Sequence, residues 1–245
     1  MKNVISSLII SVAIVVSLVG SVYLWTNYKK TANTSISATG SAEVNFDADL
    51  VVWSGSFGAR NETSQAAYES IKKDAAEVKK YLVNNGIDEN EIVFSSVDIN
   101  EINQNEYDEK GNFITSHLTG YSLYQKVTIT SKNLKTVEKI STDISSLLES
   151  GVQFTSNSPE YYCTKLDEVK LELIKKATAN AKERIDIMAA EAGASVGKLL
   201  NSRLGVFQIT AQNTGTSNYT YDGYFDTTSQ HKTATITVRL DYNLN

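Results

Sequence analysis

One segment of this chain, from Lys165 to Ala192, has the apolar period of a single long helix. Its apolar residues recur at spacings of three and four, which places them on one face: Val169, Leu173, Ala177, Ala181, Ile185, Met188 and Ala192. At about 1.5 Å of rise per residue, the helix is expected to be roughly 40 Å long. A helix with one apolar face needs a second layer to cover that face, and we expect this layer to be a β-sheet.

The rest of the chain predicts that sheet and two further helices. Apolar positions at helical spacing run from Ala67 to Leu82 and from Leu134 to Leu148, and alternating segments typical of strands lie between them. The order strand, helix, glycine, strand, polar aromatic loop, strand describes residues 49–130 and again residues 152–243. We therefore predict an α+β fold of two related βαββ units, with antiparallel sheet packed by three helices.

The N-terminal segment predicts a membrane anchor. No charged residue occurs between Val4 and Trp25, and a bilayer-spanning helix takes about 20 apolar residues. A cleaved signal peptide is the alternative, because Lys2 supplies a basic start and the sequence from Val19 to Ser21 is a weak cleavage site. We expect an uncleaved transmembrane helix within residues 1–30, because the apolar run is longer than the apolar region of a signal peptide.

Composition excludes several function classes. The net charge of −5 and the isoelectric point near 5.2 argue against a nucleic-acid partner, which normally needs a basic face. Cys163 is the single cysteine, so the chain has neither an internal disulfide nor a CxxC site. The sequence contains no GxSxG motif. We predict no catalytic, cofactor-binding or metal-binding residues, and we expect the protein not to be an enzyme.

Three residues keep a chemical alternative open. His117 and His231 are the only histidines, and each is expected just before the last strand of its unit. If the units pack symmetrically, the two imidazoles could share a metal with carboxylates. Cys163 precedes the long helix, where the helix dipole could lower its pKa. The alternative to a binding protein is therefore an envelope redox or metal-dependent factor.

The two polar loops are the strongest candidates for binding. They extend from Asn103 to His117 and from Ala211 to His231, and they concentrate aromatic residues in polar, glycine-bearing sequence. Exposed aromatic side chains in loops suit contacts with proteins or glycans, although the same side chains could fold back over the sheet ends. The candidate binding residues are Tyr107, Phe113, Tyr219, Tyr221, Tyr224 and Phe225.

The stretch EAGASVGKLL, from Glu191 to Leu200, places glycines next to a lysine as phosphate loops do. A phosphate loop leads from a strand into a helix, whereas this stretch leads from the long helix into a strand. We therefore predict that Gly193 ends the helix in a left-handed conformation.

Long stretches of the chain resemble the SIMPL domain family. The segments VQFTSNSPEYY and DEVKLELIKKATANAKERIDIMAAEAGASVGKLL resemble its closing half. SATGSAEVNFDADLVVWSGSFGAR, NNGIDENEIVFSSVDI and GYSLYQKVTIT are similar to its first half, so the resemblance covers about residues 35–243. Bacterial members include a periplasmic immunogenic protein and an oxidative stress defence protein.

The resemblance implies a location and a mode of action. Members of the family are typically exported, and some form large ring-like or channel-like homo-oligomers. The resemblance therefore implies that residues 31–245 form a SIMPL-like extracytoplasmic domain, in the periplasm or cell envelope. It also implies homo-oligomeric assembly or binding, and a role in oxidative or envelope stress tolerance. The family has no catalytic residues that could be assigned to this chain.

Overall fold

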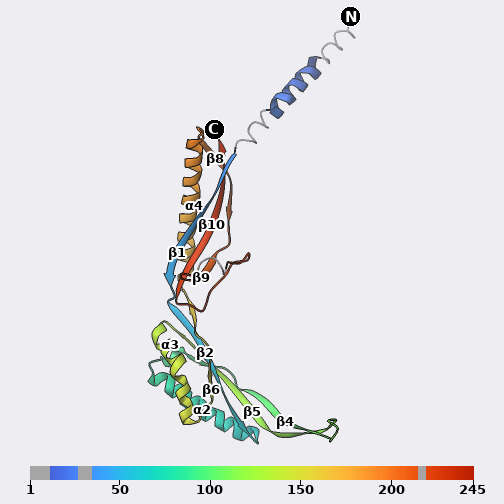
Figure 1. Ribbon diagram of the computed structural model, residues 1–245, viewed down its shortest axis with the longest axis vertical. Helices are drawn as coiled ribbons and strands as arrows, with labels where there is room; N and C mark the ends of the chain where they lie inside the picture. The colour runs from blue at the N-terminus through green and yellow to red at the C-terminus, as the bar shows by residue number, and fades with distance from the viewer. Residues whose placement is uncertain (1–11, 27–34, 215–218) are drawn as a thin grey trace.

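The computed structural model describes residues 12–26, 35–214 and 219–245. Two antiparallel sheets form an elongated molecule in Figure 1, and helices lie against each sheet. Each sheet has its own cluster of buried apolar residues. The predicted α+β class with antiparallel sheets is confirmed, but the sheet is divided into two.

The sheet near the C-terminus is built on the longest helix. Its strands are β1 (Ser35–Asp47), β10 (His231–Leu244) and β8 (Val196–Leu204) in that order, and β9 (Gln208–Ala211) also pairs with β10. The helix α4 (Leu166–Glu191) matches the predicted helix to within one residue at each end. Gly193 follows it with φ of 69°, which confirms the predicted left-handed helix end.

The apolar face of α4 meets β1 and β10 as predicted, except near its C-terminal end. Leu173, Ala177, Ala181 and Ile185 are fully buried, whereas Met188 is exposed and Ala189 is buried in its place. Ala189 comes four positions after Ile185, so the buried face continues with a step of four where the prediction assumed a step of three.

The small residues of α4 allow a close approach to β1. A Cβ on Gly40 would lie 2.8 Å from the Cα of Ala181, and still nearer to the backbone oxygen of Ala177. Side chains of α4 also reach the backbone of β1: Arg184 donates to the carbonyl of Thr39 at 2.9 Å, and Asn180 accepts from the N–H of Ser41 at 3.2 Å. The helix therefore covers a strand edge that β10 leaves unpaired.

The second sheet contains the central strands β2 (Leu50–Asn61) and β5 (Phe113–Ser131). Its order is β3 (Ile92–Phe94), β5, β2 and β6 (Phe154–Ser156); β4 (Asp98–Tyr107) also pairs with β5, and β7 (Glu160–Tyr162) with β2. The helices α2 (Ser64–Asn84) and α3 (Leu134–Asp143) cover one face, and the 3₁₀ helices η1 (Glu89–Glu91) and η2 (Ile144–Ser150) follow them. Trp53 and Phe57 of β2 and Ile71 of α2 are among the side chains buried between the sheet and these helices.

The predicted boundary between two βαββ units is wrong. Residues 154–162 pair with β2 and so belong to the sheet of the first unit. The sheet built on α4 takes β1 from the N-terminal side of the chain instead, and β1 pairs with β10 along 13 residues. Period-two alternation shows which face of a strand is buried but not which strand is its neighbour. Strand length selects the neighbour of β10, which has 14 residues and needs a long partner. β6 and β7 have three residues each and are too short for that.

The predicted polar loop from Asn103 to His117 is wrong as well. Most of it is a hairpin in which β4 pairs with β5 from Asp98↔Tyr124 to Tyr107↔Phe113. Nearly every side chain of β4 is exposed, whichever face of the strand it lies on. The sequence of β4 therefore shows little of the apolar and polar alternation that marks a half-buried strand. The carboxylate of Asp108 accepts hydrogen bonds from the backbone N–H groups of Lys110 and Asn112, and these close the turn.

The predicted anchor lies partly outside the described residues. The described part, residues 12–26, is helical with exposed side chains. In the described chain, no helix is long and apolar enough to cross a membrane.

Candidate functional site

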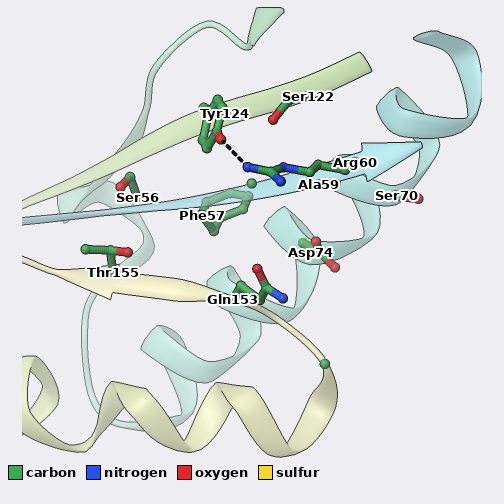
Figure 2. Close-up of a pocket in the computed structure, with 12 residues that line it drawn as sticks. Ser56, Phe57, Ala59, Arg60, Ser70, Asp74, Ser122, Tyr124, Gln153 and Thr155 are labelled. Atoms are coloured by element: carbon green, nitrogen blue, oxygen red, sulfur yellow. Dashed lines mark hydrogen bonds between the residues drawn. The ribbon is translucent and has the colours of Figure 1, made fainter. Parts of the chain in front are cut away.

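A polar cleft opens at the free end of β2. Its volume is about 490 Å³, which is within the range of ligand sites in proteins. Figure 2 shows residues of β2, β5 and α2 and of the segment around β6 at its walls. The polar side chains that line it are Ser56, Arg60, Ser70, Asp74, Ser122, Tyr124, Gln153 and Thr155.

The cleft exists because β6 stops before the end of β2. β6 pairs with β2 only from Gly55 to Phe57, whereas β5 pairs with β2 as far as Asn61. Among the described residues, no strand continues the pairing on the β6 side of β2 beyond Phe57. The cleft occupies the space in which a longer β6 would continue.

Backbone groups of Arg60 face this open edge. The N–H of Asn157 donates to the carbonyl of Ser54 at 3.0 Å, which shows that the backbone groups of Ser54 face the β6 side. Successive residues of a strand direct their backbone groups to opposite sides, so Arg60, an even number of residues further on, faces the same side as Ser54. The N–H and C=O of Arg60 therefore lie at the edge without a strand partner.

The side chain of Arg60 is the cation of the cleft. One guanidinium nitrogen, Nη2, donates to the hydroxyl of Tyr124 at 3.5 Å, and this interaction lowers the pKa of that hydroxyl. Gly58 is paired with Tyr124, and a Cβ at Gly58 would lie 2.8 Å from the tyrosine ring. The glycine therefore allows the ring to lie close against β2. Within the described chain, Arg60 forms no ion pair with a carboxylate.

Two further groups of the cleft have unused hydrogen-bonding capacity. Asp74, on α2, is half-buried, and this burial raises its pKa. It forms no ion pair with any described residue. Ser122 is 6% exposed, and its hydroxyl, which helps to lower the pKa of Tyr124, makes no hydrogen bond of good geometry to the described residues. A buried hydroxyl without a partner is costly, so a ligand that hydrogen-bonds to it would be stabilised there.

The structure separates the six predicted binding residues into two places. Tyr107 and Phe113 lie opposite each other near the turn of the β4–β5 hairpin, with ring centroids 6.1 Å apart and an edge-to-face geometry. Both side chains are exposed, at 58% and 60%. The other four predicted residues lie in the segment between β9 and β10, beside the other sheet.

This second segment folds back on β9. The side-chain amide of Gln208 donates to the carbonyl of Thr220, and its oxygen accepts from the N–H groups of Thr220 and Tyr224. Tyr219 donates to the hydroxyl of Thr235 at 2.9 Å. Only one of the four aromatic side chains projects fully into solvent, that of Tyr221 at 96% exposure.

The same segment also joins the two sheets. Phe225 stacks on Tyr162 of β7 with ring centroids 6.4 Å apart. The N–H of Tyr161 donates to the carbonyl of Thr227 at 2.7 Å. Phe225 therefore helps to hold the two sheets together, although its side chain is also exposed.

The histidines lie on different sheets. His117 is within β5, with Nε2 3.7 Å from a carboxylate oxygen of Glu106, and His231 begins β10, with Nδ1 2.7 Å from a carboxylate oxygen of Asp47. Across the described chain, no group of three or more His, Cys, Asp or Glu residues is arranged to hold a metal ion. Cys163 lies between β7 and α4 and is partly exposed.

The residues of the cleft were not predicted from the sequence. Arg60 ends an alternating segment and Asp74 lies in the polar part of a helix, where charged residues are normally solvated. Ser122 is one hydroxyl within the strand segment LTGYSLYQKVTITS. A sequence signal was present only in the alternation of β2, which places Ser56 and Arg60 on one face.

Comparison with known protein families identifies the chain. The family model of SIMPL, described as a protein of unknown function (DUF541), matches residues 36–242. No curated protein matches the chain. The matched residues include both sheets and every helix from α2 to α4. The resemblance seen in the sequence is thus confirmed, and the chain belongs to the SIMPL family.

Proposed function

We propose that this protein is a non-enzymatic component of the cell envelope that acts by homo-oligomeric assembly. The observation that carries the proposal is the outer part of the β4–β5 hairpin, residues 103–118, which we name the hairpin arm. In Figure 1 the arm extends away from the helices of its own sheet.

The hairpin arm has exposed apolar side chains along one face and at a bulge near its turn. Tyr107 and Phe113 are directly opposite each other and so share one face. Leu118, opposite Asn103, lies on that same face, and Ile114 is the extra residue of a bulge in β5. All four side chains are exposed. An apolar patch of this kind on a projecting hairpin is typical of an interaction surface. The outer edge of β4 adds unpaired backbone groups that a neighbouring chain could satisfy.

Features of the sequence support a location at the membrane surface. The absence of charge between Val4 and Trp25, with aromatic residues at its end, favours a membrane anchor. Membership of a family whose members are typically exported favours an extracytoplasmic domain in the periplasm or cell envelope. In this proposal the domain contributes to oxidative or envelope stress tolerance through assembly and not through catalysis.

Sedimentation of the full chain in density-matched detergent tests the assembly. We expect the wild-type protein to sediment as an oligomer. The Tyr107→Asp/Phe113→Asp variant should shift to monomer, with at least a tenfold loss of association, because charges replace the apolar contacts. Tyr68→Asp is the matched control, because Tyr68 is an exposed aromatic residue on α2. A wild-type protein that stays monomeric at high concentration would contradict the proposal.

A second candidate function is ligand binding by the segment that contains Tyr221. Its nearly complete exposure favours a protein or glycan ligand. Tyr221→Ser should then abolish binding and leave assembly unchanged. A redox factor would instead depend on the thiol of Cys163: Cys163→Ser would abolish the envelope phenotype without changing either assembly or ligand binding.

A further inference from the structure

We propose that the polar cleft beside β2 binds an extended peptide segment of a partner protein, which adds to the edge of β2 beyond β6 and carries adjacent acidic and basic side chains.

The backbone of β2 provides the first part of the site. The N–H and C=O of Arg60 face the edge that β6 leaves open, and the cleft provides the space for a strand there. A peptide in an extended conformation would form the ladder hydrogen bonds that β6 forms nearer the start of β2. Ser122 adds a buried hydroxyl without a partner in the described chain.

The cleft receives side chains from both faces of the sheet. Arg60, Ser122 and Tyr124 lie on the outer face, because Arg60 is opposite Ser122 and Gly58 is opposite Tyr124. Asp74 belongs to α2, which packs on the inner face beside Phe57 and Ala59. Figure 2 shows Arg60 directed at Tyr124, with Asp74 placed across β2 from that pair. Only a cavity at the edge of a strand can be lined from both faces in this way.

This arrangement determines the sequence that the site would select. Successive residues of an added strand point to opposite faces. An acidic side chain on the outer face would meet the guanidinium of Arg60, and its neighbour on the inner face would meet the carboxylate of Asp74. The preferred peptide therefore has Asp or Glu directly beside Lys or Arg. Charges two residues apart would lie on the same face and could not reach both groups.

Fluorescence anisotropy on the full chain in detergent tests this spacing. The probe is a labelled eight-residue peptide of alternating Thr and Val with a central Glu–Lys pair. Two matched peptides serve as controls: one has Glu and Lys separated by a Thr, and the other has the Glu–Lys pair with N-methylated backbone amides around it. Each control should bind about tenfold more weakly, since each loses a charge-assisted or backbone hydrogen bond.

Variants of the protein identify the groups that bind. Arg60→Glu should weaken binding of the Glu–Lys peptide about tenfold and leave the circular dichroism spectrum unchanged, because Arg60 is exposed. Asp74→Asn should weaken binding of that peptide but not of a peptide with Thr in place of Lys. Arg203→Glu, an exposed arginine on β8, is the control for net charge and should bind normally.

The outcomes separate this site from the proposed assembly. The Tyr107→Asp/Phe113→Asp variant should bind the Glu–Lys peptide as the wild-type protein does. Equal binding of the N-methylated peptide would show that the peptide does not add as a strand to β2. Equal binding of the peptide with separated charges would show that Arg60 and Asp74 do not contact neighbouring residues of the peptide. Either result, or no binding of any peptide, overturns the inference.

Discussion

Lys232 and Asp226 form a buried ion pair, with Nζ 3.4 Å from Oδ2 and with side chains that are 1% and 4% exposed. Burial favours the neutral form of Asp226, but hydrogen bonds from Ser229 and Thr228, together with Lys232, hold its pKa at about 2. The ammonium of Lys232 also donates to the backbone carbonyl of Asp226. This pair attaches the segment between β9 and β10 to the sheet below it.

The stability of the protein should fall between pH 4 and pH 2. The folded-state pKa of Asp226, about 2, is below the ordinary value of 3.8, so the folded state binds this proton less readily than the unfolded state. The ionised carboxylate of Asp226 contributes at most about 2 kcal/mol to the free energy of unfolding. This contribution is complete above pH 4 and is lost as the pH falls through the folded-state pKa. Urea denaturation across this range should show the loss, and Asp226→Asn should reduce it. An unchanged pH profile in Asp226→Asn would contradict the assignment.

Removing one member of the pair should destabilise the protein more than removing both. Lys232→Met leaves a buried carboxylate without its cation, and we expect a loss of about 3–5 kcal/mol in the free energy of unfolding. The Asp226→Asn/Lys232→Met double variant has no buried charge and should recover part of that loss. Equilibrium unfolding of the two variants gives the comparison. A double variant less stable than Lys232→Met alone would argue against a charge effect.

Gly40→Ala should separate α4 from β1. The added Cβ would lie 2.8 Å from the Cα of Ala181, in the backbone of the helix, which cannot move as a side chain can. Overpacking of this kind costs about 1–3 kcal/mol, which thermal unfolding would detect. Ser41→Ala, at an exposed neighbouring position, is the control and should unfold like the wild-type protein. A fully stable Gly40→Ala variant would show that the helix and strand are not in close contact.

Gln208→Ala should release the segment that contains Tyr221. The side chain of Gln208 makes three hydrogen bonds to the backbone of Thr220 and Tyr224, and its loss leaves those groups without their partner. We expect a loss of about 1–3 kcal/mol and faster cleavage by chymotrypsin after the tyrosines of this segment. Gln212→Ala, at an exposed position, is the control. Equal cleavage rates in the two variants would contradict the role of Gln208.

The candidate site was much less predictable than the elements around it. Arg60 and Asp74 are separated by a turn and part of a helix, and each is an ordinary polar residue in its own element. They line one cleft only because β6 begins at Phe154, opposite Phe57, and leaves the edge of β2 open beyond that pair. Tyr107 and Phe113 were predicted as exposed aromatic residues and are exposed, but on a hairpin and not on a loop.

Sequence alone determined the helices, most of the strand segments and the family. These features depend on local periodicity and on residues close together in the chain, as in α4 and its end at Gly193. Tertiary structure decided which strands are neighbours: β1 joins β10 from the opposite end of the chain, and residues 154–162 join β2. Strand pairing is satisfied by backbone groups that every residue carries, so the partner is selected by length and packing across the whole fold. The edge of β2 beside Arg60 is open because the strand selected there, β6, pairs with β2 only from Gly55 to Phe57.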